Sequence, residues 1–76
     1  MNRTIAKTLD LKGLSCPLPI VKTAQAIKEL SSGELVEAIV TDPGSMSDFP
    51  AWCTATGNEL VEFEQGDVFR YVIRKR

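Results

Sequence analysis

Cys16 is the residue of this sequence best placed to do chemistry, because it opens the run Cys-Pro-Leu-Pro formed with Pro17, Leu18 and Pro19. A cysteine thiolate attacks electrophilic sulfur and carbon, and nearby groups that lower its pKa increase the thiolate fraction. The second cysteine, Cys53, lies far away in the sequence, and there is no CxxC pair. This spacing fits neither a disulfide framework nor a zinc site. We therefore expect two free thiols and no metal.

Histidine is absent from the sequence. Without imidazole there can be no Cys-His dyad, no Ser-His-Asp triad and no histidine metal ligand. A lone thiol can attack an activated sulfur, hold it and release it, but it lacks a partner that would protonate a leaving group. The sequence therefore predicts a group carrier that acts with other proteins rather than a self-sufficient enzyme.

The two prolines predict where a helix begins. Proline is favoured in the first turn of a helix, where its missing N–H has no partner to lose, so we place Pro17 at N1 and Pro19 at N3. Cys16 then becomes the N-cap, with Leu18 N–H donating to its sulfur. Gly13 allows the sharp turn before it. An exposed helix dipole contributes about 0.3–1 kcal/mol, so we expect a moderately activated thiol. The alternative is a buried cysteine that fills the turn.

Periodicity along the chain predicts the elements that position Cys16. Alternation predicts a first strand over 4–11, with Ile5, Leu9 and Leu11 on one face. A helical pattern follows from residue 17 to about 31, capped by Gly33, and "ELVEAIV" predicts a central, parallel strand. A second helix over 45–57 and a hairpin over 59–76 complete the order βαβαββ. For so short a chain, the economical arrangement is an α+β, two-layer sandwich.

The second helix is expected to bury one stripe of side chains, namely Phe49, Trp52, Cys53 and Thr56. Cys53 is therefore predicted to be structural. We prefer Ser47 as the N-cap of this helix, because Pro50 then falls at N3, where it costs no hydrogen bond. We treat Asp42 and Asp48 as residues of the helix entry. On the hairpin we expect cross-strand pairs on an exposed sheet face, formed by Glu62, Glu64, Arg70 and Arg74.

Composition limits the classes of function. With 76 residues, the chain has room for one modest core and is expected to form a single domain, 1–76. A net charge of −1 argues against nucleic-acid binding. No apolar run reaches the length of a membrane helix, and "MNRTIAKTLD" lacks the apolar core of a signal peptide. We expect a cytoplasmic protein that does not insert into membranes.

The whole chain resembles one known family. "LDLKGLSCPLPIVKT", followed by "TDPGSMSDFPAWCTATGNEL" and "YVIRKR", is similar to the TusA/SirA-like sulfur carriers, whose mark is a Cys-Pro-x-Pro motif at the start of the first helix. The resemblance implies a mixed four-stranded sheet with both helices on one face. It also implies that Cys16 carries sulfane sulfur as a persulfide, with Pro17 and Pro19 as the motif prolines.

Partners follow from the same resemblance. A cysteine desulfurase or a rhodanese-like protein would load Cys16, and an acceptor protein would unload it, so no cofactor beyond the covalent persulfide is needed. A monomer with transient partners suits a carrier. Leu14 and Leu18 would shield the sulfur or contact a partner. Carriers of the tRNA thiouridine pathway have an acidic residue where this chain has Leu18, so the pathway stays open among tRNA thiolation, sulfur oxidation, thiosulfate uptake and selenium metabolism.

Two other classes of function remain open. A regulatory protein–protein interaction module could keep the fold without sulfur transfer, and its binding would survive Cys16→Ser. A peroxide-reacting thiol would form a sulfenic acid, usually with a resolving cysteine nearby. The core-facing register of Cys53 argues against that second role.

Overall fold

The computed structural model describes residues 4–76, which contain four strands and two helices. Residues 1–3 of the predicted single domain lie outside the described part. The elements are β1 (Ile5–Leu11), α1 (Leu18–Ile27), β2 (Leu35–Val40), α2 (Ser45–Thr56), β3 (Glu59–Gln65) and β4 (Phe69–Arg74). The predicted order βαβαββ is confirmed. No helix within residues 4–76 combines the length and the apolar character needed to cross a membrane.

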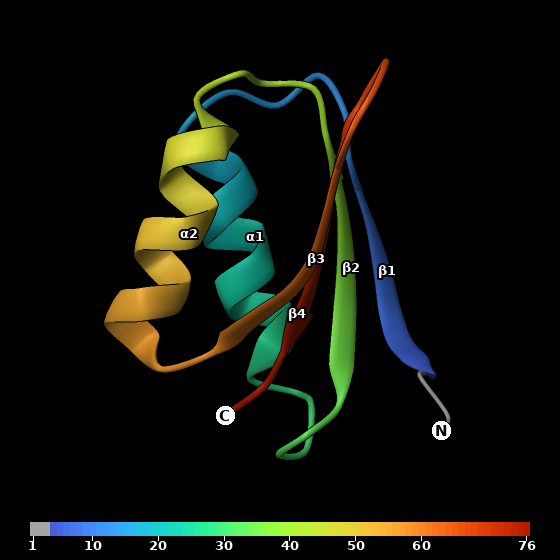
Figure 1. Cartoon of the computed structure of the whole chain (residues 1–76), viewed down its shortest axis with the longest axis vertical. Helices are drawn as coiled ribbons and strands as arrows, with labels where there is room; N and C mark the ends of the chain where they lie inside the picture. Colours follow the sequence, from blue (N-terminus) through green and yellow to red (C-terminus); the bar gives the residue numbers. More distant parts are fainter. Residues whose placement is uncertain (1–3) are drawn as a thin grey trace.

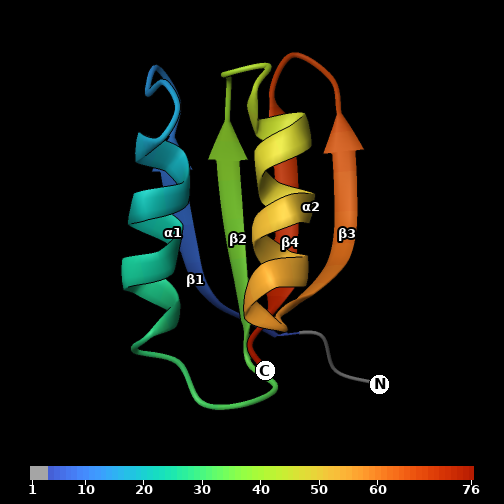
Figure 2. The ribbon, with the colours of Figure 1, turned by 90° about the vertical axis from the view of Figure 1, so that its left-hand side faces the viewer.

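The four strands form one mixed sheet in the order β1-β2-β4-β3. β1 pairs with β2 in parallel, while β4 runs antiparallel to both β2 and β3. The chain therefore makes two crossovers between parallel strands, β1-α1-β2 and β2-α2-β3, and both move in the same direction across the sheet. Because such crossovers are right-handed, both helices must lie on the same face. Figures 1 and 2 show this two-layer arrangement.

The core lies between the helices and the sheet. The β2 side chains that face the helices, Val36, Ala38 and Val40, are completely buried, as a strand between two neighbours requires. Phe49 of α2 stacks on Tyr71 of β4, with ring centroids 4.3 Å apart. The other buried members of the core are Leu11, Ile27, Leu30, Cys53 and Ile73. These contacts hold both helices at fixed positions above the sheet.

The first helix ends earlier in the chain than the sequence pattern indicates. α1 ends at Ile27, and the chain continues in tighter turns, in which Glu29 N–H donates to the Ala26 carbonyl at 3.1 Å. Leu30 is still buried, as the periodicity predicts. Gly33 does not cap this helix. With φ at +89°, it turns the chain into β2, and its N–H donates to the Lys75 carbonyl at 2.8 Å.

The second helix begins at the start of its predicted range, 45–57, but its N-cap differs from the preferred one. α2 starts at Ser45 with Gly44 as its N-cap, so the preference for Ser47 was wrong and Pro50 lies inside the helix. The reason is tertiary: the Ser45 hydroxyl is buried and bonds to Tyr71 Oη at 2.7 Å, which draws the first turn onto the sheet. Pro50 has no N–H for the Met46 carbonyl, but Met46 lies on the exposed side of this turn, where water is available.

The end of α2 agrees with the prediction. Gly57 closes the helix in the left-handed region at φ +79°, and its N–H donates to the Cys53 carbonyl at 2.9 Å. Thr56 is exposed rather than part of the buried stripe, and its hydroxyl donates to the Trp52 carbonyl at 2.7 Å. Trp52 is half-buried against the core.

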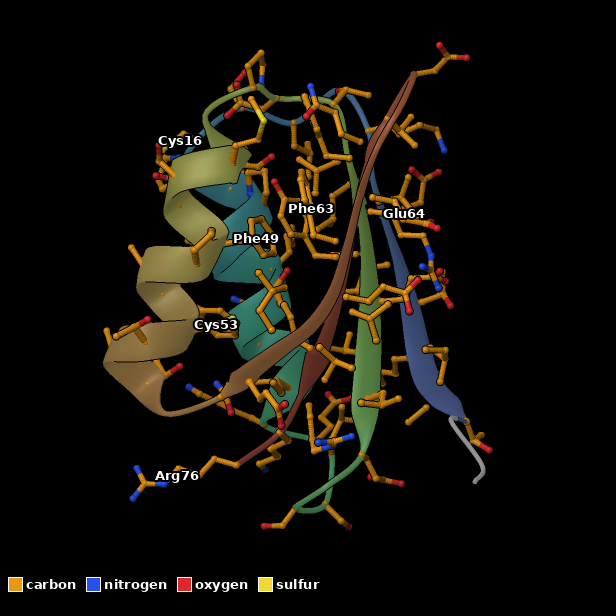
Figure 3. All side chains as sticks on the ribbon, in the orientation of Figure 1. Cys16, Phe49, Cys53, Phe63, Glu64 and Arg76 are labelled. Atoms are coloured by element: carbon orange, nitrogen blue, oxygen red, sulfur yellow. The ribbon has the colours of Figure 1, made fainter. Side chains whose placement is uncertain are left out.

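The face of the sheet away from the helices carries an ionic network. Arg70 on β4 contacts Glu62 at 2.6 Å and Glu64 at 3.2 Å on β3, as predicted, and it also contacts Glu37 on β2. These carboxylates hold the pKa of Arg70 above its ordinary value. Arg74 pairs with Glu59 at 2.7 Å instead of with the predicted glutamates. Figure 3 shows Glu64 on this outer side and Phe63 on the side of the helices.

Candidate functional site around Cys16

Cys16 lies in the loop that joins β1 to α1, at the carboxyl end of the parallel strands. β2 ends beside β1, since Leu11 pairs with Val40, so the loop that follows each strand begins at the same edge of the sheet. The two loops run close together at that end of the molecule (Figure 1). Loops beyond the carboxyl ends of parallel strands are a common place for functional residues.

Two hydrogen bonds join these loops. Gly13 N–H donates to Thr41 Oγ1 at 2.9 Å, and Cys16 N–H donates to Asp42 Oδ2 at 3.1 Å. Gly13 has φ at +83°, so this turn uses a conformation that favours glycine, as predicted. The position of Cys16 therefore depends on residues that lie far from it in the sequence.

The local geometry at the helix start differs from the predicted N-cap. α1 begins at Leu18 with Pro17 as its N-cap, which moves the boundary by one residue, and the Cys16–Pro17 peptide bond is cis. Leu18 N–H donates to the Ser15 carbonyl at 2.9 Å, so it is not bonded to the Cys16 sulfur. Pro19 is buried in the first turn, where a proline costs no helical hydrogen bond. The expected role of the prolines at the helix start is kept, but the capping role of Cys16 was wrong.

The charges around Cys16 are also different from the expectation. The Cys16 side chain is exposed, and the pKa of its thiol is raised above the ordinary value. The first cause is a hydrogen bond to the Asp48 carboxylate, followed by partial desolvation and by the negative charges of Asp48 and Asp42. Carboxylates disfavour a thiolate next to them. The predicted moderate activation of the Cys16 thiol is therefore wrong for the free protein. The alternative, a buried Cys16 that fills the turn, is excluded by its exposure.

Asp42 and Asp48 are the residues whose role the sequence did not reveal. They come from the β2–α2 loop and the first turns of α2, and both were treated only as residues of the helix entry. Because the loop after β2 lies beside the loop after β1, these carboxylates reach Cys16. The signal that could have found Asp42 is its place just after a predicted central parallel strand, at the edge where Cys16 also lies.

Apolar side chains are exposed at this same end. Leu18 and Val21 in the early part of α1, and Met46 at the start of α2, have exposed fractions of 45%, 40% and 41%. Leu14 is half-buried and packs against the core instead. The Cys16 surface is thus defined by Cys16, Asp42, Asp48 and these three apolar residues.

Cys53 has the opposite surroundings. It is only 3% exposed on the inner side of α2, and desolvation raises the pKa of its thiol to about 11. Figure 3 shows it well separated from Cys16 along the helix layer. Both cysteines are free thiols, and the structural interpretation of Cys53 agrees with this burial. Within residues 4–76, no group of three or more His, Cys, Asp or Glu side chains is placed to hold a metal ion.

Comparison with known proteins settles the family. A model of the family described as "Sulfurtransferase TusA" matches residues 7–75, which include the whole Cys16 surface. The chain belongs to the TusA family. A protein of Halobacterium salinarum is 52% identical over 73 residues, covering 93% of this chain and 90% of the relative. The sulfur carrier protein TusA of Allochromatium vinosum is 47% identical over 68 residues, covering 88% of this chain and 90% of the relative.

The fold agrees with this membership. The crystal structure of a SirA-like protein from Desulfitobacterium hafniense matches with a TM-score of 0.79 and 25% identity, over 90% of this chain and 95% of that one. The predicted resemblance to the TusA/SirA-like carriers and the predicted α+β sandwich are therefore confirmed. In this chain the fold places the exposed Cys16 at the edge of the sheet where the parallel strands end.

Proposed function

We propose that this TusA-family protein is a sulfur carrier, which accepts sulfane sulfur as a persulfide on Cys16 and passes it to an acceptor protein. The observation that supports this most is an exposed Cys16 in a Cys-Pro-Leu-Pro run at the start of α1, in a chain that belongs to the TusA family. Relatives named sulfur carrier protein TusA come from Allochromatium vinosum and Pseudomonas aeruginosa.

The reaction moves one sulfur atom without net oxidation. The Cys16 thiolate attacks the outer sulfur of a donor persulfide, so that a new S–S bond forms at Cys16 while the S–S bond of the donor breaks. The donor sulfur leaves as a thiolate, and the proton from Cys16 goes to solvent or to that thiolate. Unloading repeats these steps, with an acceptor thiolate attacking the outer sulfur of the Cys16 persulfide.

Partner proteins supply what the chain lacks. The sequence has no histidine, so a general acid or base beyond the aspartates must come from the donor or the acceptor. We propose a cysteine desulfurase or a rhodanese-like protein as donor, and a transient complex with a monomeric carrier. A reducing cytoplasm would keep Cys16 available as a thiol.

The test is mass spectrometry of the intact protein and its peptides after incubation with a cysteine desulfurase and cysteine, or with polysulfide. We expect added masses of whole sulfur atoms on the Cys16 peptide, removed by a reductant. Cys16→Ser should abolish this mass, whereas Cys53→Ser should keep it. A Cys16 that stays unmodified with every donor would refute the carrier function and favour the regulatory interaction module.

A further inference from the structure

The charged groups that face Cys16 are negative. Asp42 approaches from the loop after β2 and Asp48 from α2, and both raise the pKa of the thiol. The first turn of α1, Leu18–Val21, contains no charged residue, and Lys22 in the next turn of α1 is not among the groups that shift the pKa of Cys16. Lys12, in the loop of Cys16 itself, binds Asp10 with 3.0 Å between its Nζ and the carboxylate. Within the described part of the chain, nothing cationic offsets the two aspartates at the sulfur.

The two aspartates are held in place. Asp42 accepts the Cys16 N–H at 3.1 Å. Asp48 lies on the first turns of α2, which are anchored by the bond between Ser45 Oγ and Tyr71 Oη and by the stacking of Phe49 on Tyr71. The anchored turn keeps the backbone that carries Asp48 beside Cys16. The negative charge at Cys16 therefore follows from how the fold places these two loops.

Resting on the proposed carrier function, we infer that Cys16 exchanges sulfur with protein surfaces that bring a cationic side chain to Asp42 and Asp48 and an apolar patch to Leu18, Val21 and Met46. Charge complementarity determines this choice of partner, because an anionic surface would be repelled by both carboxylates. The exposed apolar side chains contribute area around the sulfur, as is usual at the centre of a protein interface.

Such a partner would also change the reactivity of the thiol. A cation within about 4–6 Å of a thiol favours its thiolate, so a lysine or arginine placed against the aspartates opposes their effect. Cys16 then stays protonated, and slow to react, in the free carrier and becomes a nucleophile in the complex. The thiol proton passes to solvent or to the departing thiolate. Between encounters with a partner, the protonated thiol reacts more slowly with other electrophiles, so less of the carrier is lost.

Small disulfides test the charge preference without any partner protein. Cystamine carries two positive charges, and dithiodiglycolate carries two negative ones, and each forms a mixed disulfide when the Cys16 thiolate attacks it and a small thiolate leaves. Cystamine also releases the more acidic thiol, so the rate ratio is measured against that of the uncharged thiol 2-mercaptoethanol. At low salt we expect the ratio of the cystamine rate to the dithiodiglycolate rate to be about tenfold larger for Cys16 than for 2-mercaptoethanol, since exposed charges at contact distance differ by this order. The excess should shrink in high salt. A ratio equal to that of 2-mercaptoethanol would overturn the inference.

Isosteric variants assign the preference to the two aspartates. Asp42→Asn and Asp48→Asn keep an oxygen that can accept a hydrogen bond but remove the charge, so each should lower the rate ratio about threefold. Each should also lower the midpoint of the pH profile for alkylation by neutral iodoacetamide. Glu59→Gln, which removes a carboxylate that pairs with Arg74, is the matched control and should change neither value. Unchanged ratios in both Asn variants, with circular dichroism like that of the wild type, would contradict the inference.

The small-disulfide experiment and the persulfide experiment can fail independently of each other. A protein that prefers cystamine but never takes up sulfur from a donor would lose the carrier function and keep an acidic docking surface. A protein that loads sulfur on Cys16 but shows no charge preference would keep the carrier function and lose this inference.

Discussion

Cys16 and Cys53 have the same side chain in opposite surroundings, and the pKa of each thiol is raised for a different reason. At Cys16 the cause is charge, led by the hydrogen bond to Asp48, on a side chain that solvent and partners can reach. At Cys53 the cause is desolvation on the inner side of α2. A charge effect can be reversed by another charge, but burial is reversed only by opening the fold. Accessibility, rather than pKa, therefore separates the functional thiol from the structural one.

The largest expected difference between the two thiols is in alkylation rate. At pH 8, iodoacetamide should modify Cys53 more slowly than Cys16 by roughly three orders of magnitude or more, because Cys53 reacts only after an opening that costs about 5 kcal/mol or more. Peptide mass spectrometry over time measures both rates. Denaturant should make the two rates similar, and comparable rates in the native protein would show that Cys53 is not sealed in the core.

The next difference is in stability. Cys53→Ser places a hydroxyl in an apolar site and should lower the free energy of unfolding by about 1–3 kcal/mol. Cys16→Ser changes an exposed loop side chain and should stay within about 0.5 kcal/mol of the wild type. Urea denaturation followed by circular dichroism measures both values. If Cys16→Ser were the more destabilising change, the division between a functional and a structural thiol would be wrong.

A smaller effect is expected at the hydrogen bond between Ser45 and Tyr71, which holds the first turn of α2 beside the Cys16 surface. Tyr71→Phe keeps the stack on Phe49 but leaves the buried Ser45 hydroxyl without its partner, which should cost about 1 kcal/mol or somewhat more. The same denaturation experiment measures it. Adding Ser45→Ala should recover part of the loss, because the unpaired group is then removed. No recovery in the double variant would mean that the tyrosine hydroxyl acts through something other than Ser45.

The smallest effect concerns alkaline pH. The pKa of Cys53 is about 11 in the fold, against an ordinary value of 9.0, so the folded state holds this proton more tightly than the unfolded chain does. Its contribution to stability is complete below pH 9 and is lost as pH rises toward 11. Cys53→Ala should remove this part of the alkaline decline, whereas the exposed Glu59→Gln should not. Denaturation at pH 8, 9 and 10 measures the difference between variants.

Much of the fold could be predicted from local patterns. The alternation in 4–11, the apolar run of β2 and the turn at Gly57 predicted their elements correctly, because burial and glycine conformation are properties of short segments. The N-cap of α2 could not be predicted, since it depends on Ser45 meeting Tyr71 across the core. The end of α1 was also missed, because tight turns after Ile27 still bury Leu30 and keep the same periodicity.

The sequence by itself determined that Cys16 is a thiol without a histidine partner, that prolines mark the start of the first helix, and that the elements follow in the order βαβαββ. These properties are local, so composition and periodicity are enough to read them. Only the tertiary structure decided the charge at the sulfur. Asp42 and Asp48 reach Cys16 because β1 and β2 lie side by side in parallel and Tyr71 anchors α2 above them, and no local pattern encodes which loops meet when strands pair.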